Sequence, residues 1–270
     1  MVAVEDKLVK LRDSLSGLES VVLAFSGGVD STFLLKMCRD VLGEKLLAVT
    51  ADSPIHPAHE LEEAVKTAGS LRVKHIVVHT QELQDSRFTA NTPDRCYHCK
   101  KGLLEVMKEI AADNGVLNVV EGSNADDLED YRPGARAAGE MGVRRPLQEA
   151  GLTKAEIRAI SKELELPTWD KPSLSCLASR IPYGSPITAE ALATIDAAET
   201  FIRSLGIAQV RVRHHGQTAR IEVDPGEVEK LARESNRLRV VNQLRGLGYI
   251  YVTLDLAGYR MGSLNEGVPL

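Results

Sequence analysis

The stretch VVLAFSGGVDSTFLLKMCRDVLG, residues 21–43, decides the fold of this chain. Its first five residues are all apolar, which is typical of a strand buried on both faces of a parallel sheet. The six residues SGGVDS at 26–31 then form a glycine-rich turn, and the apolar spacing after them indicates a helix that ends at Gly43. The stretch therefore predicts a strand, a tight turn and a helix in direct succession.

Further strands and helices alternate along the chain after this stretch. Short apolar runs indicate strands, and apolar residues at helical spacing indicate the helices between them. The predicted elements are strands at 45–53, 73–80 and 116–124, and helices at 57–70 and 96–114. Strands that alternate with helices in this way form βαβ units, so we expect an α/β fold with a doubly wound parallel sheet.

The character of the sequence changes near residue 187. Before it, a helix at 153–166 begins with a capping box of Thr153 and Glu156. A loop at 167–186 follows, with four prolines and no periodicity. Long loops without regular structure inside a compact chain are often functional.

The remaining residues predict a smaller α+β domain. A helix at 189–205 precedes an alternating segment at 209–223 that turns as a hairpin, and a last strand is expected at 249–256. We therefore expect two domains, 1–186 and 187–270.

The bulk composition restricts the partners of the protein. The chain has 270 residues, a formal net charge of −5 and only 4% aromatic residues. These values disfavour a nucleic-acid partner, because such partners are held by cationic grooves and aromatic stacking. No apolar run approaches the ~20 residues of a membrane span, and the charged N-terminus lacks the apolar core of a signal peptide. We therefore expect a cytoplasmic protein without membrane contact.

The SGGVDS turn has the chemistry of a phosphate site. Gly27 and Gly28 lack side chains, so a phosphate can approach their backbone amides, and the following helix directs its positive end at the anion. Ser26 and Ser31 add hydroxyl donors, and Asp30 can hold Mg²⁺ on the phosphate oxygens. The chain lacks the Walker motif. A glycine turn without a ligand is the alternative interpretation.

The four cysteines divide into one buried residue and three with possible chemistry. Cys38 lies in an apolar helical pattern and is expected to be a buried structural thiol. Cys96 and Cys99 form a C-x-x-C pair that suits a redox pair, half of a zinc site, or part of an iron–sulfur site. With Cys176 in the proline-rich loop they make three thiolates, which on a [4Fe-4S] cluster would leave one iron open. Coincidence among buried thiols remains the alternative.

Several motifs together resemble known families. SGGVDS resembles the pyrophosphate-loop (PP-loop) signature of the adenine-nucleotide α-hydrolase-like superfamily, whose members cleave ATP between the α and β phosphates. Seven motifs spread over nearly the whole chain resemble the ATP-dependent sulfur insertases of the LarE family, which mature the nickel-pincer cofactor of lactate racemase. They are SGGVDS, NTPD (91–94), DYRPG (130–134), PLQEAGLTKAEIRA (146–159), KPSLSCLASRIPYG (171–184), SLGIAQVRVRHH (204–215) and YVTLDLAGYRMG (251–262).

This resemblance implies an adenylating sulfurtransferase. Its substrate would be pyridinium-3,5-biscarboxylic acid mononucleotide, whose carboxylates become thiocarboxylates. The implied nucleotide-binding residues are Ser26, Gly27, Gly28, Asp30, Ser31, Asp52, Ser53, Gly122 and Asp126. The implied cofactors are ATP, Mg²⁺ and a [4Fe-4S] cluster.

The family delivers sulfur in two ways. In one, a cysteine that matches Cys176 gives up its own sulfur and becomes dehydroalanine. In the other, cysteines that match Cys96, Cys99 and Cys176 hold a [4Fe-4S] cluster, whose open iron carries a sulfide that a sulfur donor can replace. All three residues are present here, so the chain resembles the second type.

An arginine pair marks a second predicted anion site. Arg211 and Arg213 are two residues apart on an expected strand, so both lie on one face and Val210 and Val212 lie on the other. Paired guanidinium groups suit a phosphate or a carboxylate, although an R-x-R alone is commonly a solvated strand face.

The resemblance adds further roles to this second site. It implies that Arg180 and Arg260 join Arg211 and Arg213 around the substrate phosphate, and that Glu199 is an acidic residue near the substrate or a metal. We also expect the smaller domain to bind the substrate and to support a homo-oligomer.

Three other functions compete with this interpretation. A cluster-dependent tRNA thiolase would share the phosphate loop and the three cysteines, but the acidic chain with few aromatics disfavours it. An amide-forming PP-loop ligase has no need of the C-x-x-C pair. A non-catalytic ATP sensor has no need of Asp30 in a metal-binding position.

Overall fold

The computed structural model describes residues 3–128, 133–172 and 175–260. The chain divides into two compact units. The first unit comprises residues 1–82 and 94–174, and the second comprises 83–93 and 175–270.

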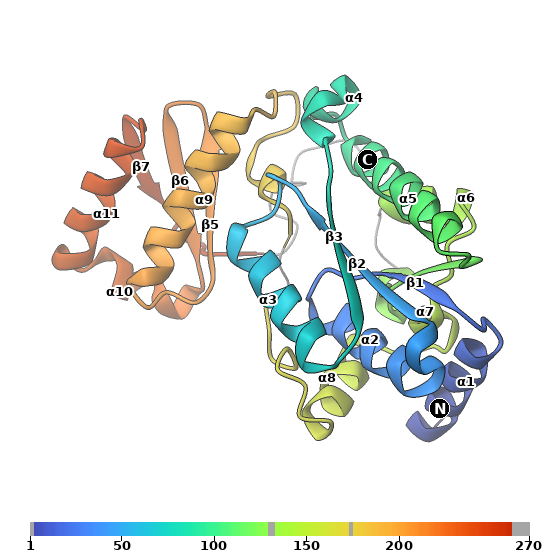
Figure 1. Ribbon diagram of the computed structural model, residues 1–270. Coiled ribbons are helices and arrows are strands. Elements are labelled where there is room, and N and C mark those ends of the chain that lie inside the picture. Colours follow the sequence, from blue (N-terminus) through green and yellow to red (C-terminus); the bar gives the residue numbers. More distant parts are fainter. Residues whose placement is uncertain (1–2, 129–132, 173–174, 261–270) are drawn as a thin grey trace. The chain divides into compact units, whose positions relative to one another are not determined.

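The first unit contains a four-stranded parallel sheet with the strand order β3-β2-β1-β4 (Figure 1). Its strands are β1 (Val21–Ala24), β2 (Leu46–Asp52), β3 (Lys74–His79) and β4 (Asn118–Glu121). Each predicted strand is therefore present, within a few residues of its expected ends. The predicted α/β fold with a parallel sheet is confirmed.

Helices connect these strands. The α-helices of the first unit are α1 (Val4–Ser16), α2 (Val29–Leu42), α3 (Ala58–Ser70), α5 (Arg95–Asp113), α6 (Pro133–Glu140), α7 (Pro146–Glu149) and α8 (Lys154–Glu163), and its short 3₁₀ turns include Gly43–Lys45 and Ala125–Leu128. The capping box that begins α8 is present as predicted. Helices α6 and α7 were not predicted, and residues 130–132 of the DYRPG motif lie outside the described residues.

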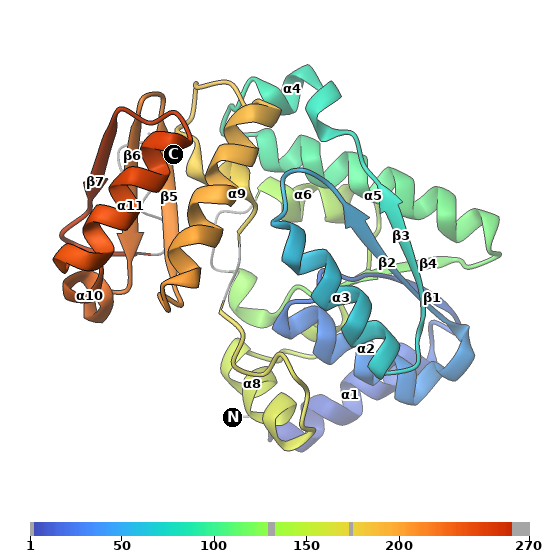
Figure 2. The same ribbon diagram turned by 60° about the vertical axis from the view of Figure 1, so that its left-hand side comes forward.

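The sheet has apolar packing on both faces, because successive side chains of a strand point in opposite directions. Val21 and Leu23 pack in a cluster with α1, α2 and α8, whereas Val22 packs in a second cluster with α5 and α6. Figure 2 shows α5 and α6 on one side of the strands and α1 and α2 on the other. This two-sided burial explains why the central strand β1 is apolar throughout.

Cys38 of α2 lies inside the first of these clusters with none of its surface exposed. Burial raises the pKa of its thiol to about 12, so it remains protonated and unreactive. The prediction of a buried structural thiol is confirmed.

The second unit contains a three-stranded mixed sheet with the order β5-β6-β7. Its elements are α4 (Ser86–Thr89), the 3₁₀ turn η4 (Leu177–Arg180), α9 (Ala189–Ser204), β5 (Val210–His215), β6 (Thr218–Val223), α10 (Val228–Ala232), α11 (Glu234–Gly246) and β7 (Tyr251–Leu254). Strands β5 and β6 form the predicted hairpin, and Gly216 in its turn has a φ of 60°. Strand β7 pairs parallel to β6.

One segment joins the second unit although its sequence neighbours belong to the first. Asn91, which is fully buried, donates from Nδ2 to the carbonyl oxygens of Pro182 and Ser185, each at 2.8 Å. The amide of Ile187 donates to Thr89 O at 2.9 Å. These bonds hold residues 83–93 against residues 182–187 of the same unit. The predicted domains, 1–186 and 187–270, assigned residues 83–93 to the first domain. The functional division between these two domains stays a prediction.

None of the helices in the described ranges combines the length and the apolarity that a bilayer crossing requires. The expected cytoplasmic location stays a prediction.

Candidate functional site

The SGGVDS turn lies where the order of the sheet reverses. From β1 the chain proceeds to β2 and β3 on one side, and then returns to β4 on the other side of β1. The turns after β1 and β4 are therefore neighbours at the carboxyl edge of the sheet, which is where open α/β folds bind ligands. Gly122 makes this contact possible, because a Cβ atom there would lie 3.0 Å from the backbone nitrogen of Ser31.

The turn itself depends on Gly27. Its φ of +69° is one that side chains rarely adopt, and an added Cβ would lie 3.0 Å from Cβ of Ala64 in α3. Gly28 has a φ of −81° and precedes α2 as its N-cap residue. Ser26 Oγ and Ser31 Oγ lie 3.0 Å apart, with Ser26 exposed at the surface. The loop thus presents a backbone amide, hydroxyl groups and a helix N-terminus together, the combination that binds phosphate.

Asp30 has one occupied and one open carboxylate oxygen. Its Oδ2 accepts from Lys154 Nζ at 2.7 Å and from Asn124 Nδ2 at 3.2 Å. In the part of the chain that the structure describes, Oδ1 is buried and accepts no hydrogen bond. A buried carboxylate oxygen without a donor fits a divalent cation, so Asp30 suits the predicted Mg²⁺.

Lys154 is a site residue that the sequence did not indicate, whereas Asn124 lies between Gly122 and Asp126 in the segment that the family resemblance predicts to face the nucleotide. Lys154 is the first residue of α8, directly after the capping residue Thr153, and Asn124 belongs to the turn after β4. Lys154 lies inside a quoted motif, but nothing in the spacing of that motif indicates a contact with Asp30. The one sequence feature that could have indicated this residue is its place directly after the predicted N-cap, Thr153, at the start of a helix.

Lys171 also reaches the phosphate loop. Its Nζ donates to Gly27 O at 3.2 Å and to Glu60 and Glu63 of α3, each at 2.8 Å. Burial alone would lower the pKa of Lys171, but the hydrogen bonds and charges of the two carboxylates outweigh it and raise that pKa. Lys171 is therefore charged at neutral pH and neutralises two acidic groups beside the loop.

Three other predicted nucleotide residues have partners within the first unit. Asp52 Oδ2 lies 2.9 Å from His79 Nδ1, and Ser53 Oγ donates to Glu82 Oε2 at 2.7 Å. Asp126 accepts from the backbone amide of Lys154 at 2.9 Å and so caps α8. Asp52 ends β2, and Ser53 and Asp126 lie just after β2 and β4 at the carboxyl edge of the sheet; their contact with a nucleotide stays a prediction.

The C-x-x-C pair occupies the first turns of α5. Cys96 is exposed and Cys99 is half-buried. Because α5 leads to β4, its N-terminus lies toward the carboxyl edge of the sheet, and a contact confirms this. Lys100 forms an ion pair with Glu121, the last residue of β4, whose side chain is only 6% exposed. The cysteine pair is thus anchored at the same edge as the phosphate loop.

The third predicted ligand, Cys176, belongs to the second unit. Within either unit, no three His, Cys, Asp or Glu side chains of the described residues gather as metal ligands would. The set of Cys96, Cys99 and Cys176 stays a prediction.

Arg180 organises the segment that carries Cys176. Its guanidinium is fully buried and binds both oxygens of Glu199, with Nε–Oε1 at 2.8 Å and Nη2–Oε2 at 3.0 Å. Its Nη1 donates to Ser175 O at 2.6 Å and to Cys176 O at 2.9 Å. Arg180 therefore orders the backbone around Cys176, and its predicted contact with a substrate phosphate stays a prediction.

Glu199 is equally enclosed. Besides Arg180, it binds Arg203 Nη2 at 2.7 Å and the amide of Val212 at 3.0 Å. Burial alone would raise the pKa of this carboxyl group, but Arg180 and Arg203 outweigh it and lower the pKa. A carboxylate held in this way joins α9 to η4 and β5, and its predicted role near substrate or metal stays a prediction.

Arg211 and Arg213 share one face of β5 as predicted. Val210 and Val212 point to the opposite face and into the apolar core of the unit. Arg213 donates to Ser179 O at 2.8 Å and to Glu222 Oε2 at 2.7 Å.

Arg211 has a different environment. Its guanidinium lies over the ring of Tyr259, 5.1 Å from the ring centroid. Burial, helped by the positive charge of Arg180, lowers the pKa of Arg211 to about 10. Arg260 follows Tyr259 and is exposed. The face carries two buried arginines, and the buried carboxylate of Glu222 lies opposite Arg211 on β6.

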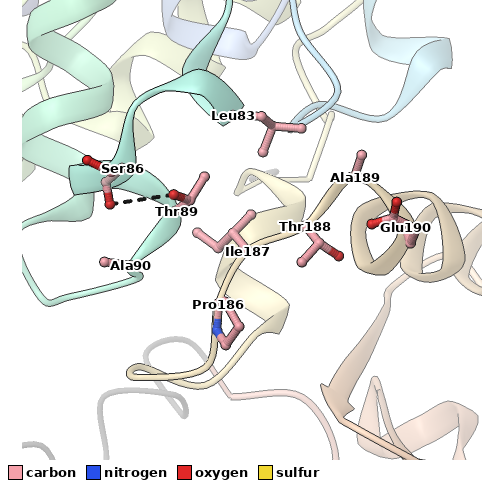
Figure 3. Close-up of a pocket in the computed structure, with 9 residues that line it drawn as sticks. All are labelled: Leu83, Ser86, Thr89, Ala90, Pro186, Ile187, Thr188, Ala189 and Glu190. Carbon is pink, nitrogen blue, oxygen red and sulfur yellow. Dashed lines mark hydrogen bonds between the residues drawn. The ribbon is translucent and has the colours of Figure 1, made fainter.

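The second unit also has an open pocket of about 630 Å³ that the sequence analysis did not predict (Figure 3). It lies between α4 and the beginning of α9, and Ile187 and Thr188 are among its lining residues. The carboxylate of Glu190 stands at this helix start, where it interacts favourably with the helix dipole.

Some known proteins are similar to part of this chain, and others are similar to nearly all of it. A family model described as NAD synthase matches residues 3–104. An uncharacterized protein of Synechocystis is 44% identical over 97% of this chain and 98% of its own length. The pyridinium-3,5-bisthiocarboxylic acid mononucleotide synthase of Lactiplantibacillus plantarum is 39% identical over 98% of this chain and 96% of its own length. A glutamine-hydrolyzing GMP synthase component of Methanocaldococcus jannaschii is 28% identical over 61% of this chain and 56% of its own length.

Proposed function

The chain belongs to the LarE-like family of PP-loop enzymes, and we propose that it converts carboxylates of pyridinium-3,5-biscarboxylic acid mononucleotide to thiocarboxylates. It is an ATP-dependent enzyme of the PP-loop type. The proposed reaction has two steps, adenylation of a substrate carboxylate and displacement of AMP by sulfur. Its product would serve the assembly of a nickel-pincer cofactor.

The observation that carries this proposal is the extent of the likeness to the L. plantarum synthase. That likeness includes 98% of this chain and therefore both units, whereas the likeness to the GMP synthase component includes 61%. A shared nucleotide-binding fold alone does not indicate a shared reaction. A match through the arginine-bearing second unit supports a shared substrate as well.

The first step uses the carboxyl edge of the first sheet. The backbone amides near Gly27 and Gly28 and the start of α2 would hold the phosphates of ATP. A substrate carboxylate oxygen attacks the α phosphorus, the bond to the β phosphate breaks, and pyrophosphate leaves. Lys154, 2.7 Å from Asp30, is placed to balance the charge of the departing group.

Two cofactors belong to the proposal. Asp30, with its open Oδ1, would hold Mg²⁺, which when bound offsets the negative charge of the phosphates. Cys96, Cys99 and Cys176 would hold a [4Fe-4S] cluster, which when bound supplies a replaceable sulfide. Thiolates are the ligands such clusters require, and Cys96 and Cys99 lie one helical turn apart on α5.

The second step needs the mononucleotide to be held in place. Sulfur attacks the activated acyl carbon, and AMP leaves with the electron pair of the broken C–O bond. Arg211 and Arg213 on β5 would bind the mononucleotide phosphate, because guanidinium groups suit its geometry. Arg180 and Glu199 hold the backbone around Cys176 and Val212 while this happens.

A coupled assay tests the proposal. Protein purified without oxygen is incubated with ATP, Mg²⁺, sulfide and the biscarboxylic mononucleotide. We expect pyrophosphate release that depends on the mononucleotide, and a thiocarboxylate product seen by mass spectrometry. Asp30→Asn should abolish both while the protein stays folded. Pyrophosphate release without the mononucleotide, or an amide product with ammonia, would contradict the proposed substrate.

The cluster has its own test in the same preparation. We expect brown protein with about four irons per chain, and loss of iron and product in Cys96→Ala, Cys99→Ala and Cys176→Ala. Cys38→Ala is the control and should keep both. A colourless enzyme that stops after one turnover and converts Cys176 to dehydroalanine would contradict the cluster.

A further inference from the structure

We propose that the ion pair of Lys100 and Glu121 is a positioning device for sulfur transfer, which holds the Cys96–Cys99 turn at the ATP site of the first unit. This inference rests on the proposed function, because it concerns the step after adenylation. Neither residue touches substrate in our proposal, and both act through the backbone elements that they join.

Glu121 is placed so that it can hold the start of α5 at a fixed position relative to β4. It is the last residue of β4, its side chain is 6% exposed, and its second oxygen accepts from Ser123 Oγ at 3.0 Å. One oxygen of Glu121 thus supports the turn that follows β4, and the other binds Lys100 of α5. A buried carboxylate with one cationic partner is a firm anchor, because losing that partner leaves an uncompensated charge.

The link from Glu121 to the phosphate loop is a single residue long. Gly122 follows directly, and its backbone approaches Ser31 and Asp30 so closely that a Cβ would lie 3.0 Å from Ser31 N and 3.2 Å from the carbonyl carbon of Asp30. No flexible side chain intervenes in this contact. This backbone packing and the pairing of Glu121 with Ala24 of β1 fix Glu121 beside the start of α2 without help from the ion pair, so loss of the pair releases α5 and not the phosphate loop.

The link from Lys100 to the cysteines is equally short. Lys100 follows Cys99 in α5, and it is four residues from Cys96, which places it on the same helix face as Cys96. A second contact supports this turn from α6, where Glu140 Oε2 accepts from Tyr97 Oη at 2.6 Å. The first turns of α5 are thus held on two sides.

This arrangement has a chemical consequence. An acyl adenylate that forms before sulfur is within reach reacts with water instead, and ATP is consumed without product. Holding the cysteine turn and the phosphate loop in one rigid frame keeps the two steps together, and misplacement by ~1 Å can lower a rate by roughly a hundredfold. The pair should therefore control how much of the adenylate becomes thiocarboxylate.

The test measures the ratio of thiocarboxylate to pyrophosphate. In Glu121→Gln, pyrophosphate release should stay near the wild-type rate while the ratio falls roughly tenfold to a hundredfold. Lys100→Arg keeps the charge of the pair and should retain most of the wild-type ratio. Lys108→Met, which removes an exposed lysine from the same helix, is the control and should leave the ratio unchanged.

A second measurement uses the metal-free protein. Iodoacetamide alkylation of Cys96, followed by mass spectrometry, should slow when α,β-methylene ATP is added to the wild type. Glu121→Gln should lose this protection at saturating nucleotide. If Glu121→Gln fails to fold, the double variant Lys100→Met with Glu121→Leu removes both charges and replaces it in each measurement.

The outcomes separate this inference from the proposed function. A wild type that releases no pyrophosphate would refute the proposed function itself. Pyrophosphate release with an unchanged ratio in Glu121→Gln would overturn only the positioning role. Equal losses of pyrophosphate and product would also overturn it, because they would mean that the pair merely stabilises the unit.

Discussion

Replacement of Glu199 by glutamine should destabilise the second unit by about 3 kcal/mol. The two side chains have nearly the same size, so the change removes charge and one acceptor without opening a cavity. Glu199 is fully buried, and its four donors come from α9, η4 and β5. The substitution therefore tests whether this carboxylate is a structural centre of the unit.

The magnitude follows from the individual contacts. Glutamine keeps an oxygen for Arg180 Nε and the Val212 amide, but it turns an amino group toward Nη2 of both Arg180 and Arg203. Removal of one partner from a buried ion pair costs about 3–5 kcal/mol. Arg203 is 21% exposed, so water can solvate its charge in part, and the lower end of this range applies.

Amide hydrogen exchange in β5 and β6 along a urea series measures this loss in the correct unit. Fluorescence of Trp169, the single tryptophan, reports the first unit and should be unchanged. Glu234→Gln, an exposed glutamate on α11, is the matched control and should leave the exchange unaffected. A loss below about 1 kcal/mol in Glu199→Gln, the size of an ordinary hydrogen bond, would refute the argument.

The same prediction has a pH dependence with a defined sign. Because Arg180 and Arg203 lower the pKa of Glu199, the folded state holds this proton less tightly than the unfolded state. The stabilisation is therefore fully present above the ordinary glutamate pKa of 4.5 and declines as the pH falls through the folded value. The difference between wild type and Glu199→Gln should shrink below pH 4.5 and stay constant near neutrality.

Four further substitutions test the two anion sites. Gly122→Ala places a Cβ 3.0 Å from Ser31 N and should slow pyrophosphate release, whereas Gly102→Ala, with open space around it, should not. Arg211→Ala and Arg213→Ala should each weaken mononucleotide binding by roughly 1.5–3 kcal/mol in titration calorimetry, and unchanged affinity in both would place the phosphate elsewhere. Lys171→Met should raise KM for ATP, because Glu60 and Glu63 then repel the phosphates; an unchanged KM would contradict this.

The sequence predicted those features that depend on local pattern. The strand before SGGVDS, the capping box of Thr153 and the alternation along β5 each occupy a few consecutive residues, and the structure contains all three. The side-chain directions of Arg211 and Arg213 were predictable for the same reason, since a strand has a period of two.

Contacts between distant residues could not be predicted in this way. Lys171 and Glu60 are 111 positions apart, and Lys154 and Asp30 are 124 apart. No periodicity connects such pairs, because the fold alone brings them together. The transfer of 83–93 to the second unit is a similar case, since it depends on the hydrogen bonds of Asn91 with residues about ninety positions away.

The long-range pairs change how the predicted anion sites work. The sequence led us to expect arginines around a phosphate at the second site and no cationic side chain at the first, but in both sites a cationic side chain is present that is already paired with a carboxylate. Lys154 binds Asp30, and Arg213 binds Glu222 at 2.7 Å. A phosphate that enters either site must therefore share or replace an existing carboxylate partner.

Such an exchange makes binding selective. An isolated buried cation would attract any small anion, whereas a paired one yields only to a group that satisfies its donors better than the carboxylate does. In the first unit, a Mg²⁺ ion held by Asp30 would provide this compensation, because it would offset the charge of the carboxylate and leave Lys154 available to the phosphates. ATP and the metal should therefore bind together more tightly than either binds alone, by the reciprocity of linked equilibria.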